Sequence, residues 1–234
     1  MKFAIIAAGE GSRLQQEGIA LPKPLVKING EAMIDRLIRI FRQNNADEIV
    51  IIVNTLNPKT EEHLKDLIAK GLGNDLRLVV KSTPSSMHSF AEIAPFLENG
   101  PFCLTTVDTI FNESEFSEYI QHFKQSNIDG CMAVTDYIDD EKPLYINTDN
   151  DMNITGFYDT NEGYKYISGG IYCLRQESIR TLHHCLDMGL SKMRNFQRAL
   201  ISEGHKLKAY PFCKILDVDH AEDITKAESF LKAQ

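Results

Sequence analysis

A glycine-containing segment lies directly after the first apolar run of this chain and precedes two basic residues. Residues 9–14 read Gly-Glu-Gly-Ser-Arg-Leu, and Lys23 stands between two prolines. A short glycine turn at the end of a strand lets backbone N–H groups face an anion, and Arg and Lys side chains neutralise phosphate charge. We therefore predict that this segment binds a polyphosphate, with Arg13 and Lys23 against its phosphate groups.

The segment differs from two well-known phosphate-binding loops. The dinucleotide-binding fingerprint requires a third glycine at position 14, where this chain has Leu14. The P-loop pattern ends in Gly-Lys followed by Ser or Thr, and the segment lacks that ending. A glycine pair alone often serves only to form a tight turn, so the phosphate interpretation depends on the combination of the loop with Arg13 and Lys23. A nicotinamide-dependent dehydrogenase is disfavoured.

The elements around this segment alternate between strand and helix patterns. Continuous apolar runs predict buried strands at 3–8 and 49–53, and further strands are predicted at 76–80, 102–107 and 131–137. Apolar residues at helical spacing predict helices at 33–41, 64–68 and 116–123. We also predict a helix capped by Ser89 and Glu92 and stopped by Pro95. Such alternation builds an open, mostly parallel sheet with right-handed crossovers.

The second half of the chain departs from this alternation. A hairpin is predicted from 144–147 and 154–158, then a strand at 166–174, helices at 179–186 and 193–201, a strand at 215–218 and a last helix at 224–231. Gly169 and Gly170 lie inside a predicted strand, where a ligand or a neighbouring backbone can approach closely. The expected fold class is a doubly wound α/β domain with helices on both faces of the sheet.

Asp108 stands at the carboxyl end of the predicted strand 102–107. Ligands of open α/β sheets collect at this edge. A hard Mg²⁺ ion needs few protein carboxylates and keeps water and phosphate oxygens as its other ligands. Asp108 is therefore a candidate metal ligand.

Length, charge and cysteine spacing limit the class of protein. The 234 residues suit one domain, expected to span 1–234, and the net charge of −8 is unfavourable for a nucleic-acid partner. No apolar stretch approaches membrane-spanning length, and the run 3–8 is too short for a signal peptide. Five widely spaced cysteines predict buried free thiols, so we expect a cytoplasmic protein without a membrane partner.

The N-terminal third resembles the sugar-1-phosphate nucleotidylyltransferases. The resemblance is carried by residues 7–14 (Ala-Ala-Gly-Glu-Gly-Ser-Arg-Leu), 22–25 (Pro-Lys-Pro-Leu) and 28–30 (Ile-Asn-Gly), and it continues at lower similarity through Asp108, residues 169–172 and residues 216–223. It covers the catalytic domain of that family. It implies a Rossmann-like fold of the GT-A type with a mostly parallel mixed sheet.

The resemblance implies roles for the residues of the glycine loop and for three aspartates. The family wraps the nucleotide phosphates with the positions of Ala7, Ala8, Gly9, Gly11 and Ser12, and binds those phosphates through the positions of Arg13 and Lys23. It holds Mg²⁺ with one Asp after the central strand, matched by Asp108, and one Asp in the closing segment. For the second ligand Asp217 fits the pattern better than Asp219, which occupies a position often held by Gly. The alternative for this segment is helix capping by Asp219 or His220, with Asp223 in the first turn.

Base and sugar recognition are less clearly marked in the sequence. Ser85 and Ser86 fall in the family's base-recognition loop, but Met87-His88-Ser89 replaces its usual Gly-Thr-Ala, so the base is not assigned. Gly169 and Gly170 match the strand that approaches the sugar. Lys165 is a candidate for the acceptor phosphate, and Glu141-Lys142-Pro143 is not assigned that role because it precedes the predicted hairpin. The adjacent His183 and His184 would point to different faces of a helix, which disfavours a shared metal ion.

The resemblance implies a nucleotidyltransferase that moves a nucleoside monophosphate from a nucleoside triphosphate to a sugar 1-phosphate and releases pyrophosphate. Its partners would be the triphosphate and a phosphorylated small-molecule acceptor, with Mg²⁺ as cofactor. Two alternatives stay open: a cytidylyl- or guanylyltransferase for phosphocholine, methylerythritol phosphate or molybdopterin, and a nucleotide-sugar-binding protein without turnover. The oligomeric state is not predicted.

Overall fold

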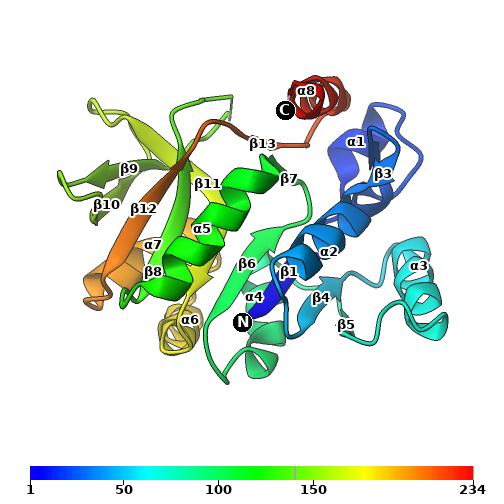
Figure 1. Cartoon of the computed structure of the whole chain (residues 1–234), viewed down its shortest axis with the longest axis horizontal. Helices are drawn as coiled ribbons and strands as arrows, with labels where there is room; N and C mark the ends of the chain where they lie inside the picture. Colours follow the sequence, from blue (N-terminus) through cyan, green and yellow to red (C-terminus); the bar gives the residue numbers. More distant parts are fainter. Residues whose placement is uncertain (140, 234) are drawn as a thin grey trace.

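One sheet of nine strands runs through the molecule, described here from a computed structural model for residues 1–139 and 141–233. Its main path follows the order β10-β9-β11-β6-β1-β4-β5, and β8 joins β11 to β12. The strands are β1 (Lys2–Ala7), β4 (Ile49–Val53), β5 (Leu76–Val80), β6 (Phe102–Thr106), β8 (Gly130–Thr135), β9 (Tyr145–Thr148), β10 (Ile154–Tyr158), β11 (Tyr166–Leu174) and β12 (Leu207–Phe212). Figure 1 shows helices in front of the sheet and behind it.

Strand β1 lies at the centre of the parallel half of the sheet. It pairs in parallel with β4 on one side and with β6 on the other, and β5 extends the parallel set beyond β4. Phe3 and Ile5 point into one hydrophobic core, whereas Ala4 and Ile6 point into the other. A strand buried on both faces must be apolar at successive positions, which explains the unbroken run that begins the chain.

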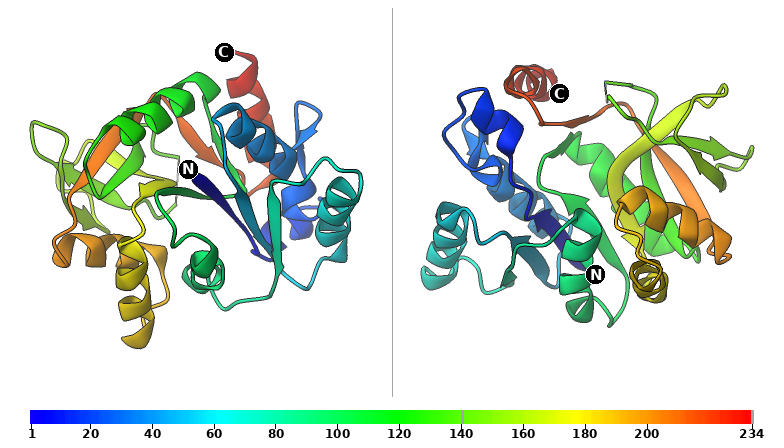
Figure 2. Two further views of the ribbon diagram at one scale, coloured as in Figure 1. Left: turned by 60° about the horizontal axis from the view of Figure 1, so that its bottom comes forward. Right: turned by 180° about the vertical axis from the view of Figure 1, so that it is seen from behind.

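Helices cover both faces of the sheet. The core around Phe3 receives α2 (Met33–Gln43), α3 (Pro58–Ala69), α5 (Glu113–Gln125) and α8 (Ala221–Lys232), and the core around Ala4 receives α4 (Ser86–Ile93), α6 (Ser178–Asp187) and α7 (Met193–Ser202). The view from behind in Figure 2 shows the gold and orange helices α6 and α7 on the second face. In the part of the chain that the structure describes, no helix has the length and apolar character needed to cross a membrane.

The second half of the sheet is organised around β11. This strand pairs antiparallel with β6, β8 and β9, and β9 forms the predicted hairpin with β10. Outside the main sheet, β13 (Ile215–Asp217) pairs antiparallel with β7 (Thr109–Phe111), and β2 (Lys27–Ile28) pairs with β3 (Glu31–Ala32). The β7–β13 ladder brings the end of the chain beside Asp108.

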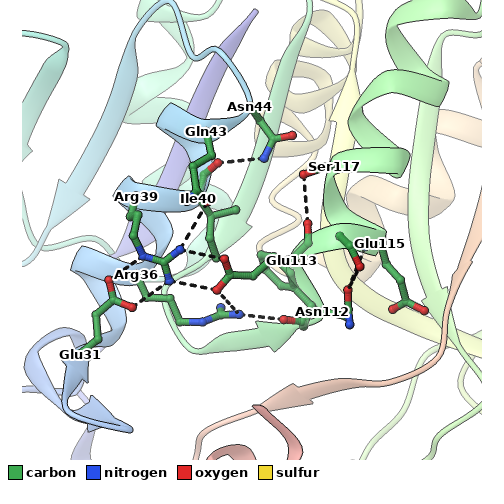
Figure 3. Close-up of polar contacts among 12 residues, drawn as sticks. Glu31, Arg36, Arg39, Ile40, Gln43, Asn44, Asn112, Glu113, Glu115 and Ser117 are labelled. Atoms are coloured by element: carbon green, nitrogen blue, oxygen red, sulfur yellow. Dashed lines mark hydrogen bonds and ion pairs between the residues drawn. The ribbon is translucent and has the colours of Figure 1, made fainter. Parts of the chain in front are cut away.

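A charged network fixes α2 between the β2–β3 hairpin and the start of α5 (Figure 3). The Arg39 guanidinium donates to Glu31 Oε1 at 2.9 Å and to Glu113 Oε2 at 2.8 Å. One turn earlier, the buried Arg36 donates from Nη2 to the backbone oxygen of Phe111 at 2.8 Å. Paired bonds from a planar guanidinium hold position as well as charge. The network therefore anchors β7, the strand that follows Asp108.

The structure confirms the α/β fold class with a mixed sheet and helices on both faces, and most predicted elements lie where the sequence placed them. The predicted capping role of Ser89 is wrong, because α4 begins earlier and Ser85 accepts from the backbone N–H of His88. Strand β12 was not predicted. Four of the cysteines are buried as predicted, but Cys213 is exposed.

The aromatic cluster of the first core predicts a large loss of stability on truncation. The Phe116 ring lies 4.7 Å from that of Phe111 and 5.7 Å from that of Phe41, measured between centroids, and all three side chains are fully buried. Phe116→Ala should lower the free energy of unfolding by about 3–5 kcal/mol in urea denaturation. The control Met188→Ala removes a side chain that is 64% exposed and should change it little. Equal effects of the two substitutions would contradict this account of the core.

Candidate active site

A cavity of about 390 Å³ lies at the carboxyl ends of β1 and β6. The glycine loop that follows β1 forms one wall, residues 83–86 at the start of α4 form another, and Asp108 lies just beyond β6. The lining includes most of the predicted phosphate and base site: Ala7, Ala8, Gly9, Gly11, Ser12, Arg13, Lys23, Ser85, Ser86, Asp108 and Asp219. Parallel strands with a common edge bring these distant segments together.

The glycine loop is held in place from two sides. Gly11 has φ +66° and stands before the short helix α1 (Ser12–Gln16). A Cβ on Gly11 would lie 3.0 Å from Lys23 Cβ, so the absence of a side chain lets the loop pack against Lys23. Asn54, the residue after β4, donates from Nδ2 to the backbone oxygen of Gly9 at 2.9 Å. Asn54 was not predicted, although it directly follows a recognised strand.

Lys23 forms ion pairs with two carboxylates that are far apart in the sequence. Its Nζ pairs with Asp108 Oδ2 and lies 2.7 Å from Asp219 Oδ1, while Arg13 Nη1 lies 3.2 Å from Asp219 Oδ2. The Lys23 side chain is only 11% exposed. Burial lowers the pKa of Lys23, but the ion pairs with Asp108 and Asp219 outweigh that effect and raise it above its ordinary value, so the ammonium is charged at neutral pH.

Asp219, rather than Asp217, shares the Lys23 ammonium with Asp108. Asp217 pairs with Thr109 in the β7–β13 ladder, and the backbone N–H of Val218 donates to the backbone oxygen of Asp108 at 3.1 Å. The turn that follows delivers Asp219 to Lys23. Asp217 instead lines a neighbouring cavity, and its role as a metal ligand stays a prediction.

The residues around Lys23 suit a divalent cation that also takes substrate oxygens. Asp108 Oδ1 is buried and has no hydrogen-bond partner among the described residues, so it is an acceptor that this part of the chain does not use. Across residues 1–139 and 141–233, no three His, Cys, Asp or Glu side chains form a metal-binding group. Mg²⁺ typically takes one or two carboxylates together with phosphate oxygens, which matches the pair Asp108 and Asp219.

A second cavity of about 380 Å³ adjoins the first and shares Arg13 and Asp219 with it. It is lined by residues of β11, by β13 and the start of α8, and by the segment after β8, including Tyr137, Lys142, Ser168, Gly169, Asp217, His220 and Lys226. Lys142, which the sequence analysis left unassigned, is among them. Lys165, the predicted ligand of the acceptor phosphate, lines neither cavity. Its Nζ lies 3.9 Å from Asp136 Oδ2.

The two predicted glycines of β11 differ in what they do. Gly169 lines the second cavity, but a Cβ on it would lie 2.2 Å from Ile215 Cδ1, so it also makes room for β13. Gly170 lines neither cavity. It has φ +72° at a shift of register between β11 and β8, which is the conformational reason for a glycine there.

The start of α8 is attached to the end of α1 beside the cavities. Glu17 accepts from the backbone N–H of Ala221 at 2.6 Å and pairs with His220 Nδ1 at 2.6 Å. Asp223 accepts from the backbone N–H of His220 at 2.8 Å, which confirms the predicted helix start. These contacts position the turn that carries Asp219.

A family model for the MobA-like NTP transferase domain matches residues 3–202 of this chain. The chain belongs to this family. It is therefore a nucleotidyltransferase, as the resemblance of its N-terminal motifs implied. The match includes the glycine loop, Lys23 and Asp108, whereas Asp219 lies beyond it.

Individual relatives agree with this assignment over nearly the whole length of this NTP transferase. A probable UDP-N-acetylglucosamine pyrophosphorylase of Acanthamoeba polyphaga mimivirus is 25% identical, over 98% of this chain and 86% of the viral one. The D-glycero-alpha-D-manno-heptose 1-phosphate guanylyltransferase of Campylobacter jejuni is 22% identical, over 89% of each chain.

Solved structures support the fold of this NTP transferase. A Bacillus anthracis protein, provisionally named a glucose-1-phosphate thymidylyltransferase, superimposes with a TM-score of 0.85 at 16% identity, over 100% of this chain and 96% of the other. The inositol-1-phosphate CTP transferase of T. maritima gives a TM-score of 0.79 at 18% identity, over 99% and 96% of the two chains.

The His220–Glu17 pair predicts a pH-dependent contribution to stability. The hydrogen bond to Glu17 raises the pKa of His220 above 6.5 in the folded state. The contribution is therefore complete below the unfolded-state pKa of about 6.5 and is lost as the pH rises through the higher folded-state pKa. Glu17→Gln, which keeps an acceptor for Ala221, should lower Tm more at about pH 5.5 than at about pH 8.5.

Thermal melts at the two pH values check this expectation. Glu10 is an exposed carboxylate of the glycine loop, so Glu10→Gln serves as the control and should change Tm equally at both. A Glu17→Gln effect that is the same at both pH values would show that the pair does not form in solution.

Proposed function

We propose that this protein transfers a nucleoside monophosphate from a nucleoside triphosphate to a sugar 1-phosphate and releases pyrophosphate. The observation that carries the proposal is Lys23, held against Asp108 and Asp219 beneath the glycine loop. A largely buried cation beside two carboxylates suits a site that binds a polyphosphate and its metal ion together. The names of the viral and Campylobacter relatives support a sugar phosphate as acceptor.

In the proposed reaction an oxygen of the acceptor phosphate attacks the α-phosphorus, and the bond from that phosphorus to the bridging oxygen of pyrophosphate breaks. Lys23 and Arg13 neutralise negative charge on the reacting phosphates, which otherwise repel each other. The glycine loop positions the triphosphate, and Ser85 and Ser86 offer hydroxyl groups to the base. Alignment of the two anions is the main task, so no side chain need act as a strong base.

A divalent cation, here proposed to be Mg²⁺, would be held by Asp108 and Asp219 and would add positive charge against the phosphates. Asp217, in the neighbouring cavity, is the alternative second ligand from the sequence. The assignment of Asp108 as a metal ligand is supported by its Oδ1 atom, which has no hydrogen-bond partner among the described residues. Metal-dependent charge neutralisation would act together with the charges of Lys23 and Arg13.

The two adjoining cavities suit two substrates. The first holds the glycine loop and Lys23 and would take the triphosphate, while the second would take the acceptor. Arg13 and Asp219 line both, so the reacting groups would meet between them. Lys142 is the residue we propose for the acceptor phosphate, in place of Lys165.

An acceptor screen tests the reaction and separates it from the alternatives. Each nucleoside triphosphate is combined with sugar 1-phosphates, phosphocholine, methylerythritol phosphate and molybdopterin, and released pyrophosphate is measured. Pyrophosphate release with a sugar 1-phosphate supports the proposal. Release with a non-sugar acceptor alone would replace it with one of the other transferases, and tight nucleotide binding without release under any condition would indicate a binding protein.

Substitution of the central ion pair should remove most activity. Lys23→Ala and Asp108→Asn should each reduce the turnover number for pyrophosphate release by about a hundredfold, because the first removes positive charge at the reacting phosphates and the second removes a proposed ligand of the divalent cation. Lys65→Ala removes an exposed cation on α3 and serves as the control. Unchanged rates in folded Lys23 and Asp108 variants would refute the assignment.

Lys142 and Lys165 form a matched pair for the acceptor site. Lys142→Ala should raise KM for the acceptor by about tenfold or more, because a hydrogen bond to a charged group is lost, while KM for the triphosphate stays the same. Lys165→Ala should change neither constant. The reverse result would restore Lys165 as the acceptor ligand.

A further inference from the structure

The charges around Lys23 are balanced within the protein itself. Two cations, Lys23 and Arg13, face two carboxylates, Asp108 and Asp219, and three ion pairs connect them: Lys23 contacts both carboxylates, and Arg13 Nη1 lies 3.2 Å from Asp219 Oδ2. Asp108 Oδ2 and both oxygens of Asp219 are therefore occupied by cations of this chain. Within residues 1–139 and 141–233, the remaining oxygen, Asp108 Oδ1, has no hydrogen-bond partner.

The Lys23 ammonium lies where a divalent cation would have to bind. An ion that took both Asp108 and Asp219 as ligands would have to lie between their carboxylates, and Lys23 Nζ already contacts both of them. The two cations cannot share this position, because their charges repel at contact distance in a partly buried site. Binding of the ion therefore requires the ammonium to move.

Lys23 also has little freedom to leave on its own. Its Cβ packs against Gly11, prolines flank it on both sides, and its side chain is 11% exposed. Moving its charge without a new anionic partner would leave the ammonium poorly solvated. A polyphosphate in the first cavity would supply such a partner.

We propose that Lys23 excludes divalent cations from Asp108 and Asp219 until a polyphosphate is bound. This inference rests on the proposed function. A divalent cation alone would add two positive charges to a balanced cluster and would have to displace Lys23 without offering it a new partner. A metal triphosphate would bring compensating negative charge and give the ammonium a new partner. The metal therefore enters together with the triphosphate, and the lysine that contacts the phosphates is also the one that keeps free metal out.

Direct metal binding without nucleotide tests this exclusion. Mn²⁺ is titrated into the protein and the free ion is measured by electron paramagnetic resonance. Lys23→Met keeps the length of the side chain and removes its charge, so it should bind Mn²⁺ about tenfold or more tightly than the wild type. Asp108→Asn added to Lys23→Met should abolish the tight binding.

Arg13→Met is the matched control. It removes the same charge from the same cavity, but Arg13 pairs with Asp219, and its loss leaves the Lys23 ammonium in place. Its Mn²⁺ affinity should change by less than about threefold, since the ammonium still occupies the site. Equal affinities of the wild type and folded Lys23→Met would overturn the inference, as would an equal increase in both variants.

A measurement on the wild type covers the case in which Lys23→Met does not fold. The protein is acetylated with an amine-reactive ester, and modification of each lysine is determined by mass spectrometry. Addition of Mg²⁺ with inorganic tripolyphosphate should change the labelling of Lys23, whereas Mg²⁺ alone should not. Lys226, whose ammonium is held by Asp139, Glu222 and Asp223, is the internal control. A change in Lys23 labelling with Mg²⁺ alone would overturn the inference.

These results are independent of the acceptor screen. Mn²⁺ affinities that contradict the inference leave the nucleotidyl transfer intact, because turnover is measured with triphosphate present. Conversely, if no acceptor released pyrophosphate but Lys23→Met still bound Mn²⁺ more tightly than the wild type, the proposed reaction would be rejected. The inference about metal exclusion by Lys23 would stand.

Discussion

The ion pairs of Lys23 with Asp108 and Asp219 connect three segments that are far apart in the sequence. The lysine follows the glycine loop, one carboxylate follows β6, and the other precedes α8. Charges that are largely removed from water need partners at close range. Each segment must therefore be held to within a fraction of an ångström of its place, and the rest of the fold can be understood as the means of holding them.

Each of the three segments has its own anchor. Asn54 bonds to the glycine loop from the end of β4, and the Arg36 and Arg39 network fixes β7 just after Asp108. Val218 bonds to the backbone of Asp108, and Glu17 attaches the start of α8 to α1. The anchors lie on the same side of the sheet as the carboxyl ends of its parallel strands, where substrates of such folds collect. Rigid elements thus position groups that themselves lie on loops.

Secondary structure was predicted most accurately where hydrophobic patterning alone determines the element. Strands β1 and β4 are buried and almost entirely apolar, and their limits were found almost to the residue. The limits of β5 were also found, although Arg77 interrupts its apolar pattern and its residues are partly buried or exposed. Strand β12 was missed because Lys208 and Pro211 interrupt its apolar pattern, which a strand paired on one side tolerates. The cap of α4 was misplaced because Ser85 and Ser89 both have suitable side chains, and only the backbone shows which of them accepts the N–H.

The residues of the candidate site were likewise predicted only in part. Motif spacing identified Arg13, Lys23 and Asp108, which are close to recognisable turns. The order of preference between Asp217 and Asp219 depended on where β13 ends, and the placement of Lys142 depended on how the segment after β8 folds over β11. Both depend on tertiary contacts between segments that sequence periodicity does not describe.

The β7–β13 ladder has a consequence for the order of folding. All nine strands of the main sheet precede β13 in the chain, so that sheet can form before β13 pairs with β7. A chain folded to that stage would carry the glycine loop, Lys23 and Asp108 but would hold its lysine against one carboxylate instead of two. Pairing of β13 with β7 would then complete the ion-pair cluster.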